Sequence, residues 1–583
     1  MKEPSQEIRT LLAIVLSMVV IVVWSYFFRP KPQPPVETAT AQKSAEGAGA
    51  TGANPAASGT PGTAGAAAGK TESATPAATT IPEAHAATAE QTLVVESGIF
   101  RVTFSNRGAS VRSWQLTKEK DDVGKTLDLV HAAAAEQTGR WPLMLSLENR
   151  EQEQAVNAGL YEMKPASGTV EAPAEVEFTW SDGHTAVVKR LKFDETFVAS
   201  VETSVTVDGK PVQHWVSWRG GFGDATAFAA PDQVKVVYSR GGSLSDIVAK
   251  KAGDSTNPDK PVRADGTYDF AGIVDHYFAA VFLPDGESGV SLEHWKYDRQ
   301  VQVDGKAETE PVAEVAASAV GDAPLRMRLF VGPKDLDVLG KIHPPLNDLV
   351  TFGSLGIIAR PLFDFLKWIH RYVPNFGWAI VLMTIAINMV LFPLKFRSFQ
   401  QMLKMQAIMP EVKQIQDRYK KYSMRDPRKQ EMNKEVMAVY QREGVNPVGS
   451  CLPMVVQMPI WFALYRMLDV AFELRQAPWI LWVHDLSSKD PYYVIPILMC
   501  VTTYLQQKLT PNTTTDPAQQ RMMNFMPLFM GFLFMRLASG LNLYILTSNV
   551  VGTVQQWFLY QVLPEAKAMN EKKKAALERK KQR

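Results

Sequence analysis

The chain has 583 residues, a formal net charge of +2 and a mean hydropathy of −0.11, values typical of a large soluble protein. These averages hide two unlike halves, because long apolar stretches occur only near the N-terminus and in the last third of the sequence. The two cysteines, Cys451 and Cys500, lie beside or within the later stretches. The composition therefore excludes a disulfide framework and a cysteine-rich metal site, and no cofactor is predicted.

An apolar run, Leu11–Phe28, lies near the N-terminus and ends in a cluster of aromatic residues. It resembles a signal peptide, but it is long for one and has no small-x-small cleavage site directly after it. The next residues are Arg29-Pro30-Lys31-Pro32, so residues 1–30 are predicted to form an uncleaved signal-anchor transmembrane helix. A cleaved signal peptide is the alternative. The aromatic cluster would lie in the far membrane interface.

Residues 31–91 are rich in Ala, Pro, Thr and Gly and contain almost no large apolar residues. Such a segment cannot bury enough surface to offset its chain entropy, so it is predicted to be a disordered linker. Within it, Gly69-Lys70-Thr71 ends like a phosphate-binding loop. The glycine that such a loop requires five residues earlier is replaced by Ala64, so no nucleotide site is expected.

The segment 92–340 alternates apolar and polar residues in short runs bounded by turn signals, which is typical of half-buried strands. The predicted strands lie in Thr92–Leu116, with a turn at Asn106-Arg107-Gly108, and in Ala186–Phe193, Phe197–Val207, Val234–Ser239, Tyr277–Leu283 and Leu325–Val331. Together they indicate a large antiparallel all-β sandwich domain. His276 follows Asp275, but no catalytic partner is in view, and a structural histidine is expected.

Residues 346–372 follow this domain. Apolar residues recur there at three- and four-residue steps from Leu355 to Tyr372, while charged residues occupy the other faces. This pattern predicts an amphipathic helix that lies in the membrane interface. A helix packed on the sandwich is the alternative.

Five further apolar stretches, each near bilayer length and dotted with polar residues, occupy the last third of the sequence. They are Trp378–Leu394, Leu452–Leu468, Tyr492–Leu509, Met522–Leu537 and Leu541–Leu559. As a helix, each can cross about 30 Å of hydrocarbon. With the N-terminal anchor they predict a membrane α-helical bundle of six transmembrane helices, five of which form a core over residues 375–563.

Basic residues predict the orientation. Residues 396–444, between the first two stretches, are predicted to form a charged helical hairpin, Phe399–Lys421 and Arg428–Glu443, that is solvated and has few apolar residues for a core. Its candidate contact residues are Lys413, Arg418, Lys420, Lys421, Arg428 and Lys429. The tail, residues 564–583, is also basic. The positive-inside rule therefore places the hairpin, the tail and both termini in the cytoplasm and the sandwich outside.

The C-terminal half carries several long motifs in a fixed order. They are NFGWAIVLMTIAINMVLFPLK (Asn375–Lys395), EGVNPVGSCLPMVVQMPIWFALY (Glu443–Tyr465), ELRQAPWILWVHDLSSKDPYYVIPILM (Glu473–Met499), TTTDPAQQRMMNFMP (Thr513–Pro527) and SGLNLYILTSN (Ser539–Asn549). Through these motifs the chain resembles the YidC/Oxa1/Alb3 membrane insertases. It is similar to their Gram-negative bacterial YidC branch over nearly its whole length, including GPKDLDVL at Gly332–Leu339.

The resemblance implies a membrane protein insertase and chaperone of the bacterial inner membrane, not an enzyme. It implies a periplasmic sandwich and a hydrophilic groove, enclosed by the five core helices and open to the cytoplasm and to lipid. The implied partners are nascent inner-membrane proteins, the Sec translocon and the lipid bilayer. The ribosome is a further candidate partner, because blocks of basic residues bind RNA phosphates; a simple topology anchor is the alternative role of the tail. The tail residues concerned are Lys572, Lys573, Lys574, Lys580 and Lys581.

Polar side chains within the apolar stretches are the candidate groove residues, because an unpaired polar group in lipid is costly and normally faces a protected interior. Thr384 and Asn388, for example, are four residues apart and share one helix face. The full set is Thr384, Asn388, Gln457, Gln506, Asn524, Asn542, Tyr544, Ser548 and Asn549. The alternative for each residue is an interhelical hydrogen bond that serves packing alone.

Two positions depart from the family pattern. Members commonly carry an arginine in the groove where this chain has Asn388, and the second of two adjacent tyrosines is replaced by Ile545. Either neutral polarity and water suffice in this groove, or another cation contributes. Arg466 is a candidate cation, but Asp469 lies three residues away, and the two are expected to form a structural pair.

The main alternative function is a polytopic small-solute transporter or channel. The sequence shows no inverted repeat, no pair of Gly/Pro-broken helices and no buried carboxylate for ion coupling, which that function would favour. A third class is a membrane-tethered sugar-binding enzyme, because sandwiches of this type often bind carbohydrate. It would require paired carboxylates in a cleft of the β domain.

Overall fold

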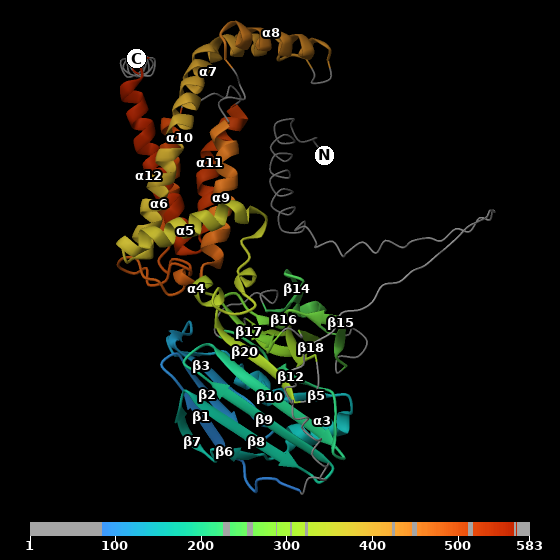
Figure 1. The fold of residues 1–583 in the computed structure, drawn as a ribbon. Coiled ribbons are helices and arrows are strands. Elements are labelled where there is room, and N and C mark those ends of the chain that lie inside the picture. Colours follow the sequence, from blue (N-terminus) through green and yellow to red (C-terminus); the bar gives the residue numbers. More distant parts are fainter. Residues whose placement is uncertain are drawn as a thin grey trace, which may run out of the picture.

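The computed structural model describes residues 84–225, 234–253, 260–286, 289–303, 306–320, 324–422, 426–445, 452–510, 517–564 and 567. The predicted signal anchor, the linker up to residue 83 and the tail from residue 568 onward lie outside the described residues. A β-rich domain occupies one end of the molecule and a helical half the other (Figure 1).

The β-rich domain contains three sheets. The first has the order β4-β3-β2-β1-β7 and consists of β1 (Thr92–Glu96), β2 (Phe100–Ser105), β3 (Ser110–Lys120), β4 (Thr126–Asp128) and β7 (Gly168–Glu171). The second sheet has the order β14-β13-β16-β17-β20-β10-β9-β8-β6, and β11 (Lys210–Pro211) pairs with β10 beside this path. Its strands are β6 (Glu162–Lys164), β8 (Ala174–Ser181), β9 (Thr185–Phe193), β10 (Val198–Val207), β13 (Lys235–Arg240), β14 (Ser243–Val248), β16 (Phe270–Val274), β17 (Phe278–Pro284) and β20 (Leu325–Pro333). The third has the order β15-β18-β19-β12-β5 and consists of β5 (Leu145–Leu147), β12 (His214–Trp218), β15 (Val262–Tyr268), β18 (Val290–Val303) and β19 (Lys306–Ala319).

The strands predicted from the alternating pattern are present. The run Thr92–Leu116 divides into β1, β2 and β3, the last of which continues to Lys120, and the other five runs differ from their predicted bounds by two residues or fewer. The single antiparallel sandwich was too simple a prediction, because the strands divide among three sheets and β1 pairs with β7 in parallel. Alternation identifies a strand and its buried face, but it does not identify the strand's neighbours. Two helices in this domain, α2 (Ala132–Thr138) and α3 (Arg150–Ala158), were not predicted.

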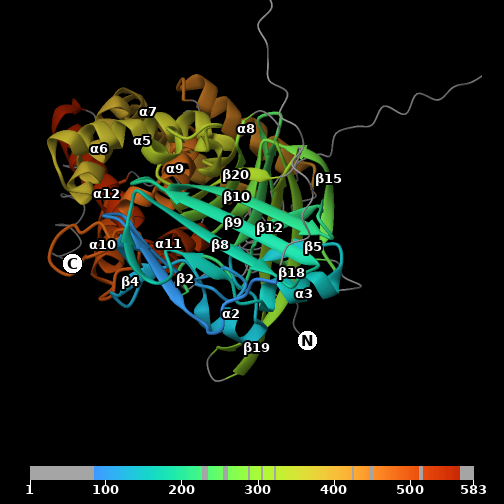
Figure 2. The same ribbon diagram turned by 60° about the horizontal axis from the view of Figure 1, so that its bottom comes forward.

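The first and second sheets pack together through aromatic side chains. The ring centre of Phe193 on β9 lies 5.7 Å from that of Phe100, 5.9 Å from that of Phe104 and 6.0 Å from that of Trp114. All four side chains are buried. Full burial of one such ring contributes about 1.5–3 kcal/mol to stability, so this contact is a main source of cohesion between the sheets. Figure 2 shows β1–β3 and β8–β10 as neighbouring layers.

One buried cation interrupts this core. Lys189 on β9 is 2% exposed, and its ammonium group donates to the backbone oxygens of Gly108 (2.8 Å), Ala109 (3.3 Å) and Leu143 (2.7 Å). Burial lowers the pKa of Lys189 to about 7. An unfolded lysine has a pKa of about 10.4, so between these two values the unfolded chain binds more protons than the folded one. The free energy of unfolding should therefore rise with pH across this window.

The helical half begins with the short α4 (Leu336–Leu339) and contains eight further helices in the described residues. They are α5 (Gly356–Tyr372), α6 (Phe376–Val390), α7 (Phe392–Arg418), α8 (Arg428–Arg442), α9 (Leu452–Val470), α10 (Val494–Leu509), α11 (Pro517–Phe534) and α12 (Ser539–Val562). The first predicted apolar stretch, Trp378–Leu394, is not one helix, because α6 and α7 meet at a bend of 56°. Pro393 lies in the first turn of α7, where its missing N–H group costs no hydrogen bond.

None of the helices in the described residues is by itself long and apolar enough to cross a bilayer, although α6 and α7 meet that measure together as a bent pair. That each of the five apolar stretches crosses the membrane stays a prediction. Polar residues and prolines occur within these stretches, for example Pro459 in α9 and Pro527 in α11. They lower the mean hydropathy of the helices that contain them.

The amphipathic helix is shorter than predicted and packs elsewhere than on the β-rich domain. It begins at Gly356, after 3-10 turns at Asn347–Leu349 and Gly353–Leu355. Its buried residues are Ala359, Phe363, Leu366 and Ile369, and the helix contacts α6 and α9. The alternative of packing on the sandwich is therefore wrong. Figure 1 shows α5 lying across the helical half at the end that faces the β-rich domain. Its place in a membrane interface stays a prediction.

Arg475, in the loop after α9, fastens the helical half to the β-rich domain. Its side chain is 4% exposed and donates to carboxylate oxygens of Glu119 (3.3 Å) and Asp224 (2.9 Å). The guanidinium also lies over the ring of Phe278, 5.2 Å from its centre. Because a buried charge requires partners, these contacts hold the loop in one position on the β-rich domain.

His276 adds a second tie and has the structural role expected of it. Its Nε2 bonds to the backbone oxygen of Asp469 at 2.7 Å, which links the β-rich domain to the end of α9. The side chain of Asp469 pairs with Arg466 at 2.8 Å, so the predicted structural pair is confirmed. Phe472 packs edge-on against Phe278, with 5.8 Å between ring centres.

Replacing Lys189 with Met should remove the part of the pH dependence of stability between pH 7 and 10 that this buried lysine contributes. From pH 7 to pH 10 the unfolding free energy of wild type should rise relative to that of K189M, by an amount on the order of 2–4 kcal/mol. Urea unfolding of the detergent-solubilised protein, followed by tryptophan fluorescence, measures it. Lys192→Met is the matched control, because Lys192 lies on the same strand with its side chain 62% exposed. A wild-type profile that is flat, or that falls with pH, would contradict the assignment.

Candidate functional site

A buried polar cluster joins α6, α7 and α12. Thr384 and Asn388 on α6 are both 0% exposed. The Asn388 amide donates to the backbone oxygen of Thr384 at 2.8 Å and to Ser548 Oγ on α12 at 3.4 Å. Thr384 satisfies its own hydroxyl within α6 by donating to the backbone oxygen of Ile380 at 2.6 Å. Three of the nine predicted groove residues therefore meet at one place.

Lys395 supplies a cation to this cluster. Its ammonium group donates to Asn388 Oδ1 at 2.6 Å and to Gln555 Oε1 at 3.4 Å, and Gln555 Nε2 donates in turn to the backbone oxygen of Asn388 at 3.0 Å. No carboxylate lies within salt-bridge distance of Lys395 among the residues that the structure describes. Within the described part of the chain, amide dipoles therefore balance the positive charge.

Sequence reasoning missed both Lys395 and Gln555. Lys395 follows the first apolar stretch directly and was not among the candidate groove residues, although it lies seven residues after Asn388, a spacing of two helical turns that keeps both on one face. The bend between α6 and α7 preserves this proximity. Arg466, the cation considered beforehand, is paired with Asp469 and takes no part.

A second group of polar contacts connects α10 and α12. Asn549 donates to Thr503 Oγ1 at 2.7 Å, and Gln556 donates to Thr510 Oγ1 at 3.2 Å. Gly552 allows the two helices to approach, because a Cβ at this position would lie 2.6 Å from Gln506 Nε2. Asn549 and Gln506 thus lie on the facing surfaces of α12 and α10, and their part in a groove stays a prediction.

The remaining predicted residues are more dispersed. Gln457 on α9 donates to the hydroxyl of Tyr544 at 3.5 Å, and Tyr544 is 1% exposed. Asn542 is fully buried and donates to the backbone oxygens of Phe534 (3.0 Å) and Leu537 (3.2 Å), so it holds the end of α11 in place. Asn524 on α11 is exposed. These residues are not brought into contact with the Lys395 cluster.

The α7–α8 hairpin has an apolar core of its own, contrary to expectation. Its buried residues are Met405, Ile408, Val412 and Ile415 on α7, Val439 on α8 and the following Val445. The four residues on α7 recur at three- and four-residue steps, a signal that the charged composition concealed. Ion pairs join the two helices at Arg418–Glu435 (3.1 Å) and Arg442–Glu411 (2.7 Å).

The basic candidates of the hairpin lie on its surface. Lys413, Lys420 and Lys421 are exposed, and Arg418 is exposed beside Glu435. Arg428 lies over the ring of Tyr422, 4.2 Å from its centre, and Lys429 is half-buried. The candidate ribosome contacts, Lys572, Lys573, Lys574, Lys580 and Lys581, lie outside the described residues.

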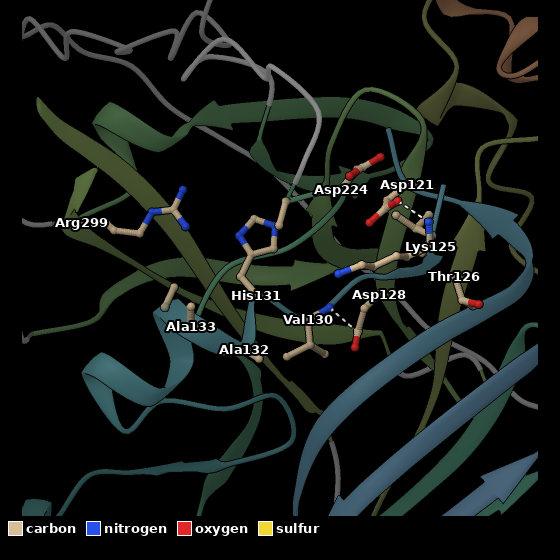
Figure 3. A pocket seen from close by; sticks show the side chains of 13 residues that line it. Asp121, Lys125, Thr126, Asp128, Val130, His131, Ala132, Ala133, Asp224 and Arg299 are labelled. Atoms are coloured by element: carbon tan, nitrogen blue, oxygen red, sulfur yellow. Dashed lines mark hydrogen bonds between the residues drawn. The ribbon is translucent and has the colours of Figure 1, made fainter. Parts of the chain in front are cut away.

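A cavity of about 260 Å³ lies in the β-rich domain beside the Arg475 contact. Figure 3 shows His131 in its middle, with Arg299 on one side and Lys125 and Asp224 on the other. Burial lowers the pKa of His131 to about 4, so its ring is neutral at physiological pH. The carboxylates serve local structure: Asp224 pairs with Arg475, and Asp128 accepts from Ser113 at 2.6 Å. The residues described here thus form no free carboxylate pair for sugar chemistry.

Comparisons with known proteins match both halves of the chain. Residues 92–365 match the family model described as YidC periplasmic domain, and residues 368–567 match the one described as 60Kd inner membrane protein. A curated relative from Burkholderia multivorans, named membrane protein insertase YidC, is 32% identical over 95% of this chain and 98% of the relative. The relative of the same name from Cupriavidus necator is 31% identical over 96% of this chain and 98% of the relative.

Other matches are partial or more distant. The Wolinella succinogenes relative, also named membrane protein insertase YidC, is 37% identical over 58% of this chain, and in that alignment the chain spans 61% of the relative's length. A solved structure titled "Active YidC insertase crystal structure with the first transmembrane domain resolved" is 17% identical, with a TM-score of 0.34, over 82% of this chain and 94% of that one. The two consecutive domain models and the nearly complete alignments at about one-third identity show that the chain belongs to the YidC family of inner-membrane protein insertases.

Proposed function

We propose that this chain integrates client proteins into the bacterial inner membrane through a hydrophilic groove formed by α6, α7, α10 and α12. The observation that carries the proposal is the cluster in which the half-buried ammonium group of Lys395 bonds to the buried amides of Asn388 and Gln555. Family membership supports the activity, and the polar contacts along α12 support the position of the groove.

The groove lowers the cost of moving a polar client segment into the membrane. Each unsatisfied polar group that enters hydrocarbon costs several kcal/mol. The hydroxyl of Ser548 and the amides of Asn388, Gln555 and Asn549 can exchange hydrogen bonds with such a segment or with water beside it. The apolar part of the client then moves sideways into lipid, favoured by about 25 cal/mol for each Å² of apolar surface transferred.

Lys395 gives the groove a preference for acidic client segments. Its charge is held by the oxygens of two amides, which are weaker partners than a carboxylate. An Asp or Glu side chain in the extramembrane tail of a client can pair with the ammonium group. Lys395 thus takes the place of the arginine that relatives carry at the position of Asn388. Of the two expectations for this groove, neutral polarity with water or another cation, we adopt the second.

We place the α7–α8 hairpin and both termini in the cytoplasm and the β-rich domain in the periplasm, with six transmembrane segments in all. The positive-inside rule supports this orientation. Figure 1 supports it further, because the hairpin and the C-terminal end of α12 lie at the end of the helical half opposite the β-rich domain. Nascent inner-membrane proteins, the Sec translocon, lipid and the ribosome are the partners we propose on family grounds.

Lys395→Met should slow the insertion of a client with an acidic N-terminal tail about tenfold, equivalent to about 1.4 kcal/mol, because the variant keeps the side-chain volume but removes the charge. A client with a neutral tail should be affected much less. Insertion is timed by protease protection in reconstituted vesicles.

Two variants make this test specific. Lys404→Met is the control, because Lys404 is an exposed lysine on the same helix. Asn388→Arg in the Lys395→Met background should restore the rate, since it returns a cation to the cluster. Equal rates for both clients in Lys395→Met would contradict the role of the charge.

Truncation after Pro564 should weaken ribosome binding at low salt and leave little difference at high salt, because contacts between lysines and RNA phosphates release counterions. Co-sedimentation of ribosomes with vesicles at two salt concentrations measures the effect. Binding that is unchanged by the truncation at low salt would leave the tail with a topological role only.

Deletion of the β-rich domain should leave insertion of a short single-span client measurable, because the proposed groove residues all lie after Phe376. The deletion should run from Thr92 to Pro333, since β20 lies between β10 and β17 and would otherwise be left unpaired. The helix α5 is kept, because it packs on α6 and α9. Insertion is scored against the intact chain, and a deletion variant that is stably folded yet inactive would show that the groove alone is not sufficient.

A further inference from the structure

The third sheet of the β-rich domain has two unlike faces. Its inner face is apolar and belongs to the domain core through residues such as Leu292, Val315 and Trp218. Its outer face carries the alternate residues, which include charged and aromatic side chains among small ones. The strand register aligns Trp295 with Glu314 there, and the same face carries Arg263 opposite Glu293 and Trp215 opposite Ser146.

This outer face is buried although it is charged. Glu293 and Glu314 are both 0% exposed, and Glu153 from α3 is 7% exposed. Burial raises the pKa of Glu293 above its usual value. Ion pairs with arginines compensate the charges, for instance Arg263–Glu293 at 2.5 Å and Arg219–Glu153 at 3.2 Å. Buried ion pairs add little net stability compared with apolar packing, so packing alone is a weak reason for such a layer.

A cavity of about 580 Å³ lies against this charged layer. Its lining residues come from β5, α3, β15 and β18 and from the loops beside them: Ser146, Glu153, Arg150, Lys260, Arg263 and Trp295. This volume suits a small organic ligand, and a concave site with convergent polar groups is where such ligands bind. Figures 1 and 2 both show α3 and β5 on the part of the β-rich domain away from the helical half. A ligand here would therefore come from solution, not from lipid.

The hydrogen bonds of the layer indicate what kind of ligand fits. Both carboxylate oxygens of Glu293, of Glu314 and of Glu153 already accept a hydrogen bond. By contrast, Nε1 of the lining residue Trp295 is a buried donor with no hydrogen-bond acceptor among the described residues. Glu148 also lines the cavity, but its carboxylate accepts from Arg263 at 2.9 Å. The unsatisfied indole donor favours a ligand that presents acceptor oxygens.

The aromatic residues argue against a sugar. Trp215 and Trp295 are only 6% and 1% exposed, and each has a guanidinium group over its ring, from Arg263 at 4.5 Å and from Arg219 at 4.3 Å. Neither indole therefore offers an open face on which a sugar ring could stack. At the rim, Arg150 and Lys260 are exposed basic residues that suit an anion.

We propose that this cavity binds a small soluble anion with a carboxylate or phosphate group, which Arg150, Lys260 and Arg263 would hold through charge-assisted hydrogen bonds. Trp295 would add a neutral donor at the base of the cavity. No part of this assignment depends on the insertion groove, which lies in the helical half.

Calorimetric titration of the full-length protein in nanodiscs of neutral lipid tests the proposal with citrate and with inorganic phosphate as separate probes. At least one should bind saturably at millimolar concentration or below, at low ionic strength. The Arg150→Ala, Lys260→Ala double variant should weaken binding about tenfold or more, because it removes two charged partners. Lys251→Ala is the matched control, an exposed lysine outside the cavity, and should bind like wild type.

Trp295→Phe keeps an aromatic ring but removes the N–H donor, and should weaken binding about threefold. Because Trp295 is buried, the variant should also have a lower melting temperature, so its binding is measured well below that temperature. In nitrogen-15 spectra the indole signal that this variant lacks should shift when the anion is added. Absence of saturable heat with both probes, binding that survives the double variant, or binding of glucose in preference to either anion would overturn the proposal.

Discussion

A polar group buried among apolar side chains must find a hydrogen-bond partner, and this requirement organises the helical half of the chain. Asn388 illustrates it: its side-chain amide bonds to Thr384, Ser548 and Lys395, and its backbone oxygen accepts from Gln555. These bonds fix the relative positions of α6, α7 and α12. A cluster held by amides and hydroxyls can also exchange its bonds with water or with a passing chain, which a packed apolar core cannot do.

The same requirement governs the contact between the two halves. Arg475 enters the β-rich domain as a buried cation and is held by Glu119 and Asp224, while the ring of Phe472 packs beside it on Phe278. The loop between α9 and α10 is thereby fastened at the end of the helical half that faces the β-rich domain. The α7–α8 hairpin, at the other end, is fastened by its own small apolar core. The helices of the proposed groove therefore lie between one end tied to the β-rich domain and one that carries a separate folded unit.

Sequence reasoning predicted features that depend on local periodicity. The strands of the β-rich domain and the helices α9 to α12 follow from alternation and from apolar length, and the clustering of Thr384 and Asn388 follows from their four-residue spacing. It failed where distant residues decide the outcome. The division into three sheets depends on which strands pair, and the bend before Pro393 was hidden within a continuous apolar run. Lys395 was missed because it lies just beyond the apolar stretch from which the candidate groove residues were taken, and only the packing of α12 against α6 brings Gln555 to it.

Access of water to the Lys395 cluster tests the central claim most directly. In a chain whose two cysteines are replaced by serine, a cysteine at position 548 should react quickly with a water-soluble maleimide in intact membranes, because only a hydrated thiol ionises readily. A cysteine at position 550, where Val550 is 45% exposed on the outside of the same helix, should react slowly, since the account places that side chain against lipid. Fast labelling at 548 together with slow labelling at 550 is the predicted result. Equally slow labelling at both positions would contradict a hydrated groove.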